Sequence, residues 1–248
     1  MKTKTAAEIA SLAKSARMLR DILTQVCAAV KPGVTGIEVA KLAEELIKKA
    51  GGVSAFIGYG KPPYPSALCV SVNSCVVHGI PSAYRFRSGD IVGLDIGMIY
   101  EGLYTDMART VAIEPISEKE RLLVATAKEA LDKALQTIAP GVTTGDIGFI
   151  VQSFVESRGF GVVRDLAGHG VGHRLHEPPE VPNFGGRGDG TELVPGMVLA
   201  LEPMITLGGW EVETAPDRWS VMTVDGSKAA HFEDMVVVTD AGHTILTR

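Results

Sequence analysis

Two stretches of the chain place a single carboxylate in an otherwise apolar run. Residues 89–97 read GDIVGLDIG and residues 196–204 read GMVLALEPM, and aligning them places Asp95 opposite Glu202, each closing an apolar strand. A buried acid costs several kcal/mol unless a partner compensates its charge. Two such acids at matched positions predict that both carboxylates converge on one cation-binding centre.

Three further residues complete a candidate ligand set: Asp106, His169 and Glu233. Four carboxylates and one imidazole form an oxygen-rich set, which suits Mn²⁺, Fe²⁺ or Co²⁺ better than a thiolate zinc site. Because four negative charges need more than one dication, we expect two metals sharing a hydroxide nucleophile, as in two-metal hydrolases. The alternative is that some acids pair with Arg or Lys at the surface. Apolar neighbours weaken that alternative for Asp95 and Glu202.

The histidines differ in their surroundings. His169 lies between two glycines, which disfavour a helix, so His169 and His173 are not a helical zinc pair and His173 receives no role. A hydrogen-bonded structural imidazole is the alternative for His169. His78 and His176 each closely precede a proline, which suits rigid hydrogen-bond donors to a substrate carbonyl or oxyanion. Taken alone, each of these two histidines fits a surface loop as well as it fits a functional site.

Composition excludes several classes of function. The three cysteines lack CxxC spacing, which argues for a reducing compartment and against a disulfide framework. The N-terminal stretch carries charges throughout, so it is neither a signal peptide nor a membrane span. No Lys/Arg run marks a nucleic-acid footprint. There is also no phosphate loop, Gly-x-Ser-x-Gly elbow or HExxH motif. We therefore expect a cytoplasmic protein that binds neither nucleic acid nor membrane.

An internal repeat organises the chain. Residues 31–51 (KPGVTGIEVAKLAEELIKKAG) resemble residues 139–159 (APGVTTGDIGFIVQSFVESRG), and both have capping-box spacing after the Pro-Gly pair. An amphipathic helix over roughly residues 5–30 precedes the first copy, and a helix starting at Ser117 precedes the second. The two copies are separated by nearly the same number of residues as Asp95 and Glu202. We therefore reject chance similarity of two helix starts as the explanation. We expect one domain, 1–248, with halves of about 1–115 and 116–248.

Strands are predicted after each pair of helices. Residues 67–77 form one, and residues 91–99 and 103–113 flank a hairpin turn at Glu101-Gly102. If the turn closes there, residue 97 lies opposite residue 106, so Asp95 and Asp106 share one face of the hairpin. The Gly/Pro-rich residues 178–196 are expected to form a long loop.

Motifs along essentially the whole chain resemble the type I methionine aminopeptidases of the pita-bread metallopeptidase family. The matching stretches are SVNSCVVHGIP (71–81), GDIVGLDIG with YTDMART (104–110), GHGVGHRLHEPP (168–179), GMVLALEPMI (196–205) and RWSVMTVDGSKAAHFEDMVVVTDAG (218–242). The resemblance implies an α+β pita-bread fold, with two pseudo-symmetric halves, antiparallel sheet and helices outside.

The resemblance also implies roles for individual residues. The five candidate ligands would hold two divalent ions (Co²⁺, Mn²⁺, Fe²⁺ or Zn²⁺), with Asp106 and Glu233 bridging both. Glu202 would also help to activate the bridging water. His78 would contact the substrate near its scissile amide, and His176 would polarise the carbonyl. The remaining matches shape a methionine pocket: Tyr64, Cys69 and Trp219.

The implied activity is hydrolytic removal of N-terminal methionine, from nascent proteins and peptides with a small second residue, by a metal-bridged hydroxide. We also expect a monomer that contacts the ribosome transiently. Two alternatives stay open: a proline-directed aminopeptidase or dipeptidase of the same fold, and a catalytically silent binding module. Two departures concern the pocket. Leu175 stands where an aromatic wall is expected, and the loop at residues 58–65 leaves the contact of Tyr59 open.

Overall fold

A computed structural model describes residues 3–248 and contains four long helices. They are α1 (Ala6–Ala29), α2 (Gly36–Lys49), α3 (Glu118–Thr137) and α4 (Thr144–Glu156). Each begins with a capping box, in which a hydroxyl accepts from the third helical N–H and an acid accepts from the cap N–H. The capping boxes expected after the two Pro-Gly pairs are confirmed at Thr35 and Thr143, and the helix expected from Ser117 begins there. Ser117 and Thr5 provide the other two boxes.

Short antiparallel strands fill the remainder of the fold. Those before α3 are β1 (Val53–Ser54), β2 (Cys69–Val72), β3 (Cys75–Val77), β4 (Ile91–Tyr100) and β5 (Leu103–Ala112). Those after α4 are β6 (Gly161–Val162), β7 (Ala167–Gly170), β8 (Glu177–Pro182), β9 (Val198–Leu201), β10 (Met204–Thr206), β11 (Val212–Thr214), β12 (Val221–Thr223), β13 (Ala229–His231), β14 (Asp234–Thr239) and β15 (Gly242–Ile245).

Two sheets carry most of the architecture. In one, β4 lies between β2 and β5 at its centre and pairs with β1 near its end. The other has the order β15-β14-β9-β7-β8. Three-stranded sheets, β13-β10-β6 and β11-β12-β3, complete the fold.

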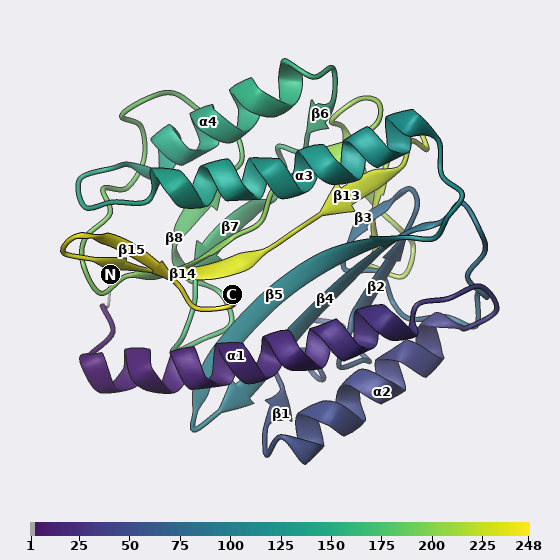
Figure 1. The fold of residues 1–248 in the computed structure, drawn as a ribbon, viewed down its shortest axis with the longest axis horizontal. Helices are drawn as coiled ribbons and strands as arrows, with labels where there is room; N and C mark the ends of the chain where they lie inside the picture. Colours follow the sequence, from purple (N-terminus) through teal and green to yellow (C-terminus); the bar gives the residue numbers. More distant parts are fainter. Residues whose placement is uncertain (1–2) are drawn as a thin grey trace.

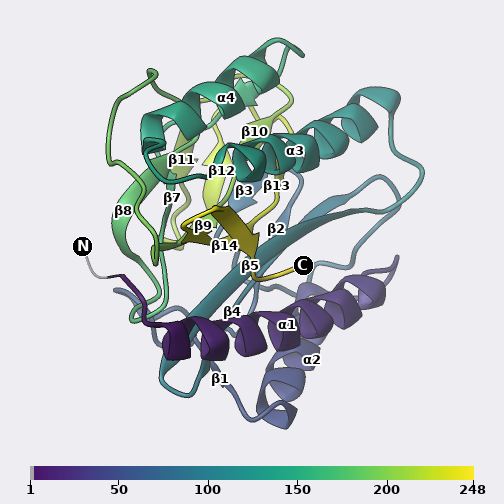
Figure 2. The same ribbon diagram turned by 60° about the vertical axis from the view of Figure 1, so that its left-hand side comes forward.

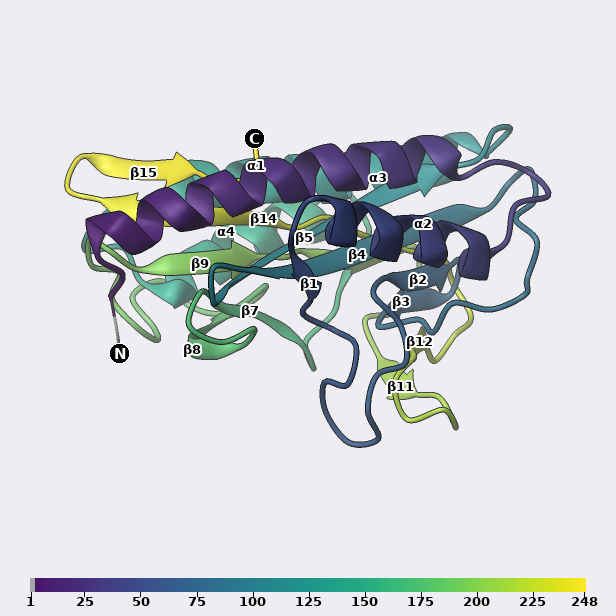
Figure 3. The ribbon, with the colours of Figure 1, turned by 90° about the horizontal axis from the view of Figure 1, so that it is seen from below.

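The helices lie outside the strands in two pairs. Helices α1 and α2 pack below the β4–β5 hairpin, and α3 and α4 pack above the later strands (Figures 1 and 2). The edge-on view shows α1 and α2 along one side of the strands, with β7, β8, β11 and β12 toward the other (Figure 3). Each pair covers its own apolar core. The predicted α+β arrangement with external helices is confirmed, and within residues 3–248 no helix is long and apolar enough to span a membrane.

The β4–β5 hairpin has the expected register, and each strand ends within one residue of its predicted bound. Gly97 pairs with Asp106, and Glu101 and Gly102 both have positive φ (51° and 78°), as a type I′ turn requires. Asp95 does not close its strand, because β4 continues to Tyr100. Glycine at 97 admits the Phe56 ring, which lies 2.6 Å from where a β-carbon would stand. The expectation that Asp95 closes its strand is therefore wrong, and Asp95 lies near the middle of β4.

Two other boundaries differ from the prediction. The strand predicted over 67–77 is interrupted at Asn73, whose φ is 56° and whose amide oxygen accepts from the N–H of Ile91 at 3.0 Å. Asparagine tolerates this left-handed conformation, so the segment folds back as β2 and β3. The loop predicted over 178–196 begins with residues of β8. That strand lies at a sheet edge, where prolines without an N–H are tolerated.

Candidate metal centre

Backbone pairing brings three of the candidate ligands onto adjacent strands. Asp95 of β4 lies opposite Ala108 of β5, and Asp106 lies two residues along β5 from Ala108. On its other side Ala108 pairs with Glu233: the Glu233 N–H donates to the Ala108 carbonyl at 3.0 Å and the Ala108 N–H donates in return at 3.4 Å. A segment just before β14 thus delivers Glu233 to the two aspartates of the hairpin.

The five-stranded sheet supplies the other two candidates. His169 of β7 lies opposite Ala200 of β9, and Glu202 follows the last residue of that strand. Asp234 pairs with Leu201, so the chain places Glu233 next to Glu202. Nε2 of His169 is 3.5 Å from Oε1 of Glu202. All five predicted ligands are therefore brought together.

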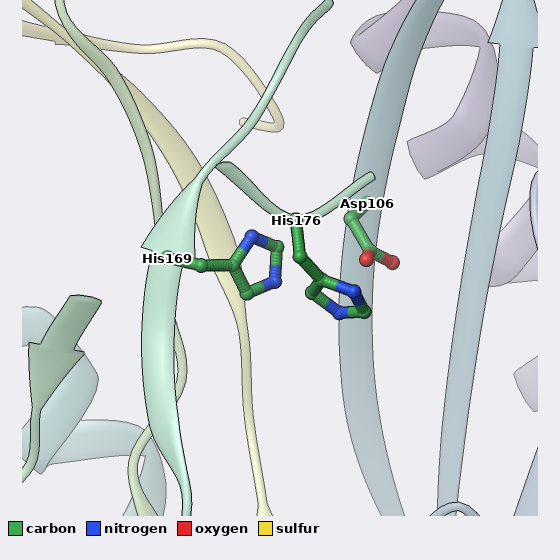
Figure 4. Close-up of side chains that lie close together, drawn as sticks. All are labelled: Asp106, His169 and His176. Atoms are coloured by element: carbon green, nitrogen blue, oxygen red, sulfur yellow. The ribbon is translucent and has the colours of Figure 1, made fainter. Parts of the chain in front are cut away.

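Their donor atoms form overlapping groups. Asp95, Asp106 and Glu233 each offer one atom within 4.8 Å of the others, and so do His169, Glu202 and Glu233. Asp106, His169 and His176 form a third group, in which the two imidazoles lie beside the carboxylate (Figure 4). Glu233 belongs to the two groups that contain only predicted ligands, and Asp106 reaches toward His169. This arrangement suits two neighbouring cations with shared carboxylates.

The charges of these buried acids fit a divalent metal centre. Among residues 3–248, Oδ1 of Asp95, Oδ1 of Asp106 and Oε1 of Glu233 are buried without a hydrogen-bond partner. Burial raises the pKa of Asp95 to about 7. Burial, together with the neighbouring carboxylates, raises the pKa of Asp106 and of Glu233 well above the ordinary range. Divalent cations would compensate this buried charge, and the donor set is one that Mn²⁺, Fe²⁺ or Co²⁺ accepts.

The other two candidate ligands, Glu202 and His169, differ from these acids in their protonation. Burial raises the pKa of Glu202, but the close imidazole of His231 and those of His169 and His78 outweigh burial, so the net pKa lies below the usual value. Nδ1 of His169 is 2.9 Å from the Gly170 carbonyl, which can only accept. Nδ1 therefore carries the proton, and the lone pair of Nε2 faces the cluster, as a metal-binding histidine requires.

A pocket of about 120 Å³ opens beside the carboxylates. Its lining includes all five residues predicted to contact substrate: Tyr64, Cys69, His78, His176 and Trp219. A cavity of this size is close to the roughly 150 Å³ that holds a benzene ring, so it accommodates one side chain. Hydrogen bonds to the backbone hold two of the aromatic side chains in its wall. The Tyr64 hydroxyl donates to the Gly79 carbonyl at 2.8 Å, and the Trp219 indole donates to the Pro62 carbonyl at 3.0 Å.

His78 and His176 line both this pocket and an adjoining groove of about 1010 Å³. The ring of His176 packs edge-on against that of His169, with centroids 4.3 Å apart. Burial lowers the pKa of His78, and burial and the neighbouring His169 lower the pKa of His176 to about 4. Both imidazoles are therefore neutral at pH 7, and each can donate one N–H to a substrate oxygen.

Sequence reasoning missed or left open several residues of the site. Phe56, Tyr59 and Leu175 line the pocket, and Leu175 is buried in its wall against the aromatic side chains. His231 was missed as well; it ends β13, two residues before Glu233. His173 is directed elsewhere, with Nε2 2.8 Å from Oε1 of Glu8.

Comparison with known proteins gives consistent matches. The model of metallopeptidase family M24 matches residues 10–240. A methionine aminopeptidase of Clostridium acetobutylicum is 44% identical over 98% of this chain and 97% of its own length. Methionine aminopeptidase 1 of Bacillus subtilis is 40% identical over 99% and 98%. The crystal structure of a Thermotoga maritima methionine aminopeptidase superposes with a TM-score of 0.97 at 43% identity, covering 100% of this chain and 99% of that one. The pita-bread fold expected from the sequence is thereby confirmed.

Proline-directed enzymes of the same fold are less similar. A Xaa-Pro dipeptidase from Bacillus anthracis superposes with a TM-score of 0.79 at 25% identity. The match covers 99% of this chain but only 62% of the dipeptidase.

Proposed function

The chain belongs to metallopeptidase family M24, and from that membership we propose that it removes N-terminal methionine from nascent proteins and peptides with a small second residue. It is a metal-dependent exopeptidase, a hydrolase, like the full-length relatives it matches. One observation carries the choice of substrate: the carboxylate cluster lines a pocket that is large enough for one side chain, together with aromatic residues and the Cys69 thiol. Such walls suit a flexible thioether.

We assign two divalent ions, Co²⁺, Mn²⁺, Fe²⁺ or Zn²⁺, to the cluster. Asp95, Asp106, His169, Glu202 and Glu233 would hold them, with Asp106 and Glu233 shared. When bound, the ions supply Lewis acidity and generate the nucleophile from water at neutral pH. The orphaned buried carboxylate oxygens and the outward lone pair of His169 support this assignment.

The protein side chains would handle the substrate and its protons. Glu202, whose pKa is lowered and which is ionised at pH 7, would accept a proton from the attacking water. Neutral His176 would donate to the scissile carbonyl, and neutral His78 would contact the substrate close to the scissile amide. The first side chain would fill the pocket, and the peptide would leave between these histidines along the adjoining groove. A bulky second residue should therefore slow the reaction.

Competition between two peptides tests this specificity. Chelated enzyme should be inactive, and Co²⁺, Mn²⁺ or Fe²⁺ should restore cleavage of Met-Ala-Ser, whereas acylation of its N-terminus should block it. Norleucine should be accepted in place of methionine, because one methylene in an apolar pocket changes rates by only about 10–200-fold. Faster cleavage of an Ala-Pro dipeptide would favour the proline-directed alternative. No cleavage of either by metal-loaded enzyme would favour a silent binding module.

We also propose that residues 1–248 form one catalytic domain of two similar halves, about 1–115 and 116–248. Matched backbone geometry supports the duplication: Gly33 and Gly141 have φ of 88° and 86°, and Gly51 and Gly159 have φ of 78° and 77°. We propose further that the enzyme works as a monomer in the cytoplasm, meets nascent chains at the ribosome and has no specific affinity for nucleic acid. Sedimentation with and without ribosomes tests the assembly.

A further inference from the structure

His231 is a buried side chain to which the proposed mechanism gives no role. It is the last residue of β13, two residues before Glu233, and only 3% of its surface is exposed. Its backbone is held by Thr110, whose hydroxyl donates to the His231 carbonyl at 2.6 Å and accepts from its N–H at 3.0 Å. The backbone position is thus secured without the imidazole, which is free to serve the site.

The imidazoles of His231 and His169 lie close to different oxygens of the Glu202 carboxylate. Nε2 of His231 is 3.4 Å from Oε2 of Glu202, while Nε2 of His169 is 3.5 Å from Oε1. Among residues 3–248, Nε2 of His231 is buried and has no hydrogen-bond partner of ordinary geometry. The two oxygens of Glu202 are therefore divided between two imidazoles.

We propose that His231 is a positioning residue for Glu202: it donates its Nε2 proton to Oε2 and thereby holds Oε1 toward the ion that His169 and Glu233 bind. This rests on the proposed metal centre. A carboxylate that binds a metal through one oxygen is oriented by a hydrogen bond to the other, and losing such a partner costs about 10–100-fold in metal affinity. A small rotation of the carboxylate would shorten the contact to the usual distance of about 2.9–3.0 Å.

Direct coordination by His231 is the competing interpretation. The donor groups within residues 3–248 argue against it, because no set of three donor atoms within 4.8 Å of one another includes His231. By contrast, His169, Glu202 and Glu233 form such a set. The geometry therefore favours an outer position for His231, behind Glu202.

Metal titration of His231 variants separates these roles. In His231→Gln the amide nitrogen can stand near the position of Nε2, so the donor is kept, whereas His231→Leu removes it. Wild-type protein and variants, freed of metal by chelation, would be titrated with Co²⁺. The heat of binding and the visible absorption of Co²⁺ would both be recorded. His231→Leu should weaken one equivalent of Co²⁺ by about 10–100-fold and leave the other unchanged. His231→Gln should bind both within a few-fold of wild type.

Matched variants make the result decisive. His169→Ala should lose the same equivalent that His231→Leu weakens, because both affect the group containing Glu202. His231→Asn, whose shorter amide cannot reach Oε2, replaces the leucine variant if that one fails to melt cooperatively. Wild-type affinity at both equivalents in His231→Leu or His231→Asn overturns the proposal. A second result would also overturn the proposal: His231→Gln that binds Co²⁺ as weakly as His231→Leu and has an altered Co²⁺ spectrum. That result would indicate direct coordination by His231.

The titration uses no substrate, so it does not depend on which peptide is cleaved. Wild-type protein that binds no Co²⁺ would overturn the metal centre and this inference together. Protein that binds two equivalents but spares methionyl peptides would overturn only the proposed specificity.

Discussion

The phenolic oxygen of Tyr59 lies 2.5 Å from Nδ1 of His176. Burial raises the pKa of Tyr59, and the pKa of His176 is about 4, so at pH 7 a neutral phenol meets a neutral imidazole. The donor role proposed for His176 needs the imidazole proton on Nε2, so we expect the phenol to donate to Nδ1. The exposed Tyr59, from the loop at residues 58–65, would then select the tautomer that can donate to a substrate oxygen.

Tyr59→Phe tests this relationship. Losing one neutral hydrogen bond, worth about 0.5–1.5 kcal/mol, should lower kcat about 2- to 12-fold without changing metal content. Steady-state kinetics with Met-Ala-Ser and elemental analysis give both values. Tyr100→Phe is the control, because that hydroxyl accepts from Lys14 on α1, away from the site, at 2.6 Å. An unchanged kcat in Tyr59→Phe would show that His176 keeps its tautomer unaided.

The buried ion pair of Lys4 and Glu177 should matter for stability. The Lys4 side chain is 2% exposed, its ammonium contacts Glu177, and Glu177 directly follows His176. The backbone N–H of Lys4 also donates to the Gly196 carbonyl at 2.8 Å. Lys4→Met leaves the Glu177 carboxylate without its cation, although the His173 N–H still donates to Oε1 at 3.3 Å. The loss of the buried cation should lower the free energy of unfolding by about 3–5 kcal/mol.

Urea unfolding of metal-loaded protein measures this loss. Lys14→Met is the matched control, since Lys14 and Glu101 form an exposed pair that is 54% accessible on both sides. We expect no measurable change there. Equal effects of the two substitutions would contradict a special contribution from the buried pair.

His169 and His173 should behave oppositely on substitution. His169→Ala removes the only nitrogen in the proposed ligand set and should lower metal affinity by at least tenfold. His173→Ala should retain metal, because Nε2 of His173 is bonded to Glu8 at the start of α1. Isothermal titration with Mn²⁺ distinguishes them. Wild-type affinity in His169→Ala, with a loss in His173→Ala, would mean that the wrong histidine is assigned.

The stability of metal-free protein should fall as pH rises above neutrality. A group with a raised folded pKa stabilises the fold below its unfolded pKa, and this stability is lost as pH rises through the folded value. Asp95, with a pKa of about 7, is such a group. His78 and His176 have lowered pKa values, so their contribution is lost only as pH falls below about 6.5. Between about pH 6.5 and 8 the acids dominate.

Thermal melts across that interval measure the effect. The Tm of chelated protein should decrease from about pH 6.5 to 8, and saturating Mn²⁺ should raise Tm and flatten the decrease, since it binds only the folded state. A metal-free Tm that rises over the same interval would show that the buried carboxylates do not retain protons.

Local patterns in the sequence were sufficient for the helices and for the central hairpin. Capping boxes define helix starts within four residues, so Thr35, Ser117 and Thr143 could be identified without tertiary information. The Glu101-Gly102 turn fixes hairpin register by its own geometry, which placed Asp95 and Asp106 on one face. The resemblance to the family then implied a metal-binding role for all five candidate ligands.

Tertiary structure decided what depends on contacts between distant segments. The Phe56 ring packs against Gly97, two residues after Asp95, and no local pattern reports that contact. The sequence likewise says nothing of Ala108 pairing with Glu233, which joins the hairpin to β14 and closes the cluster. His231 meets Glu202, and Tyr59 meets His176, across 29 and 117 positions of the chain. Such contacts arise from packing of whole elements, since residues far apart in sequence carry no spacing that determines their distance in space.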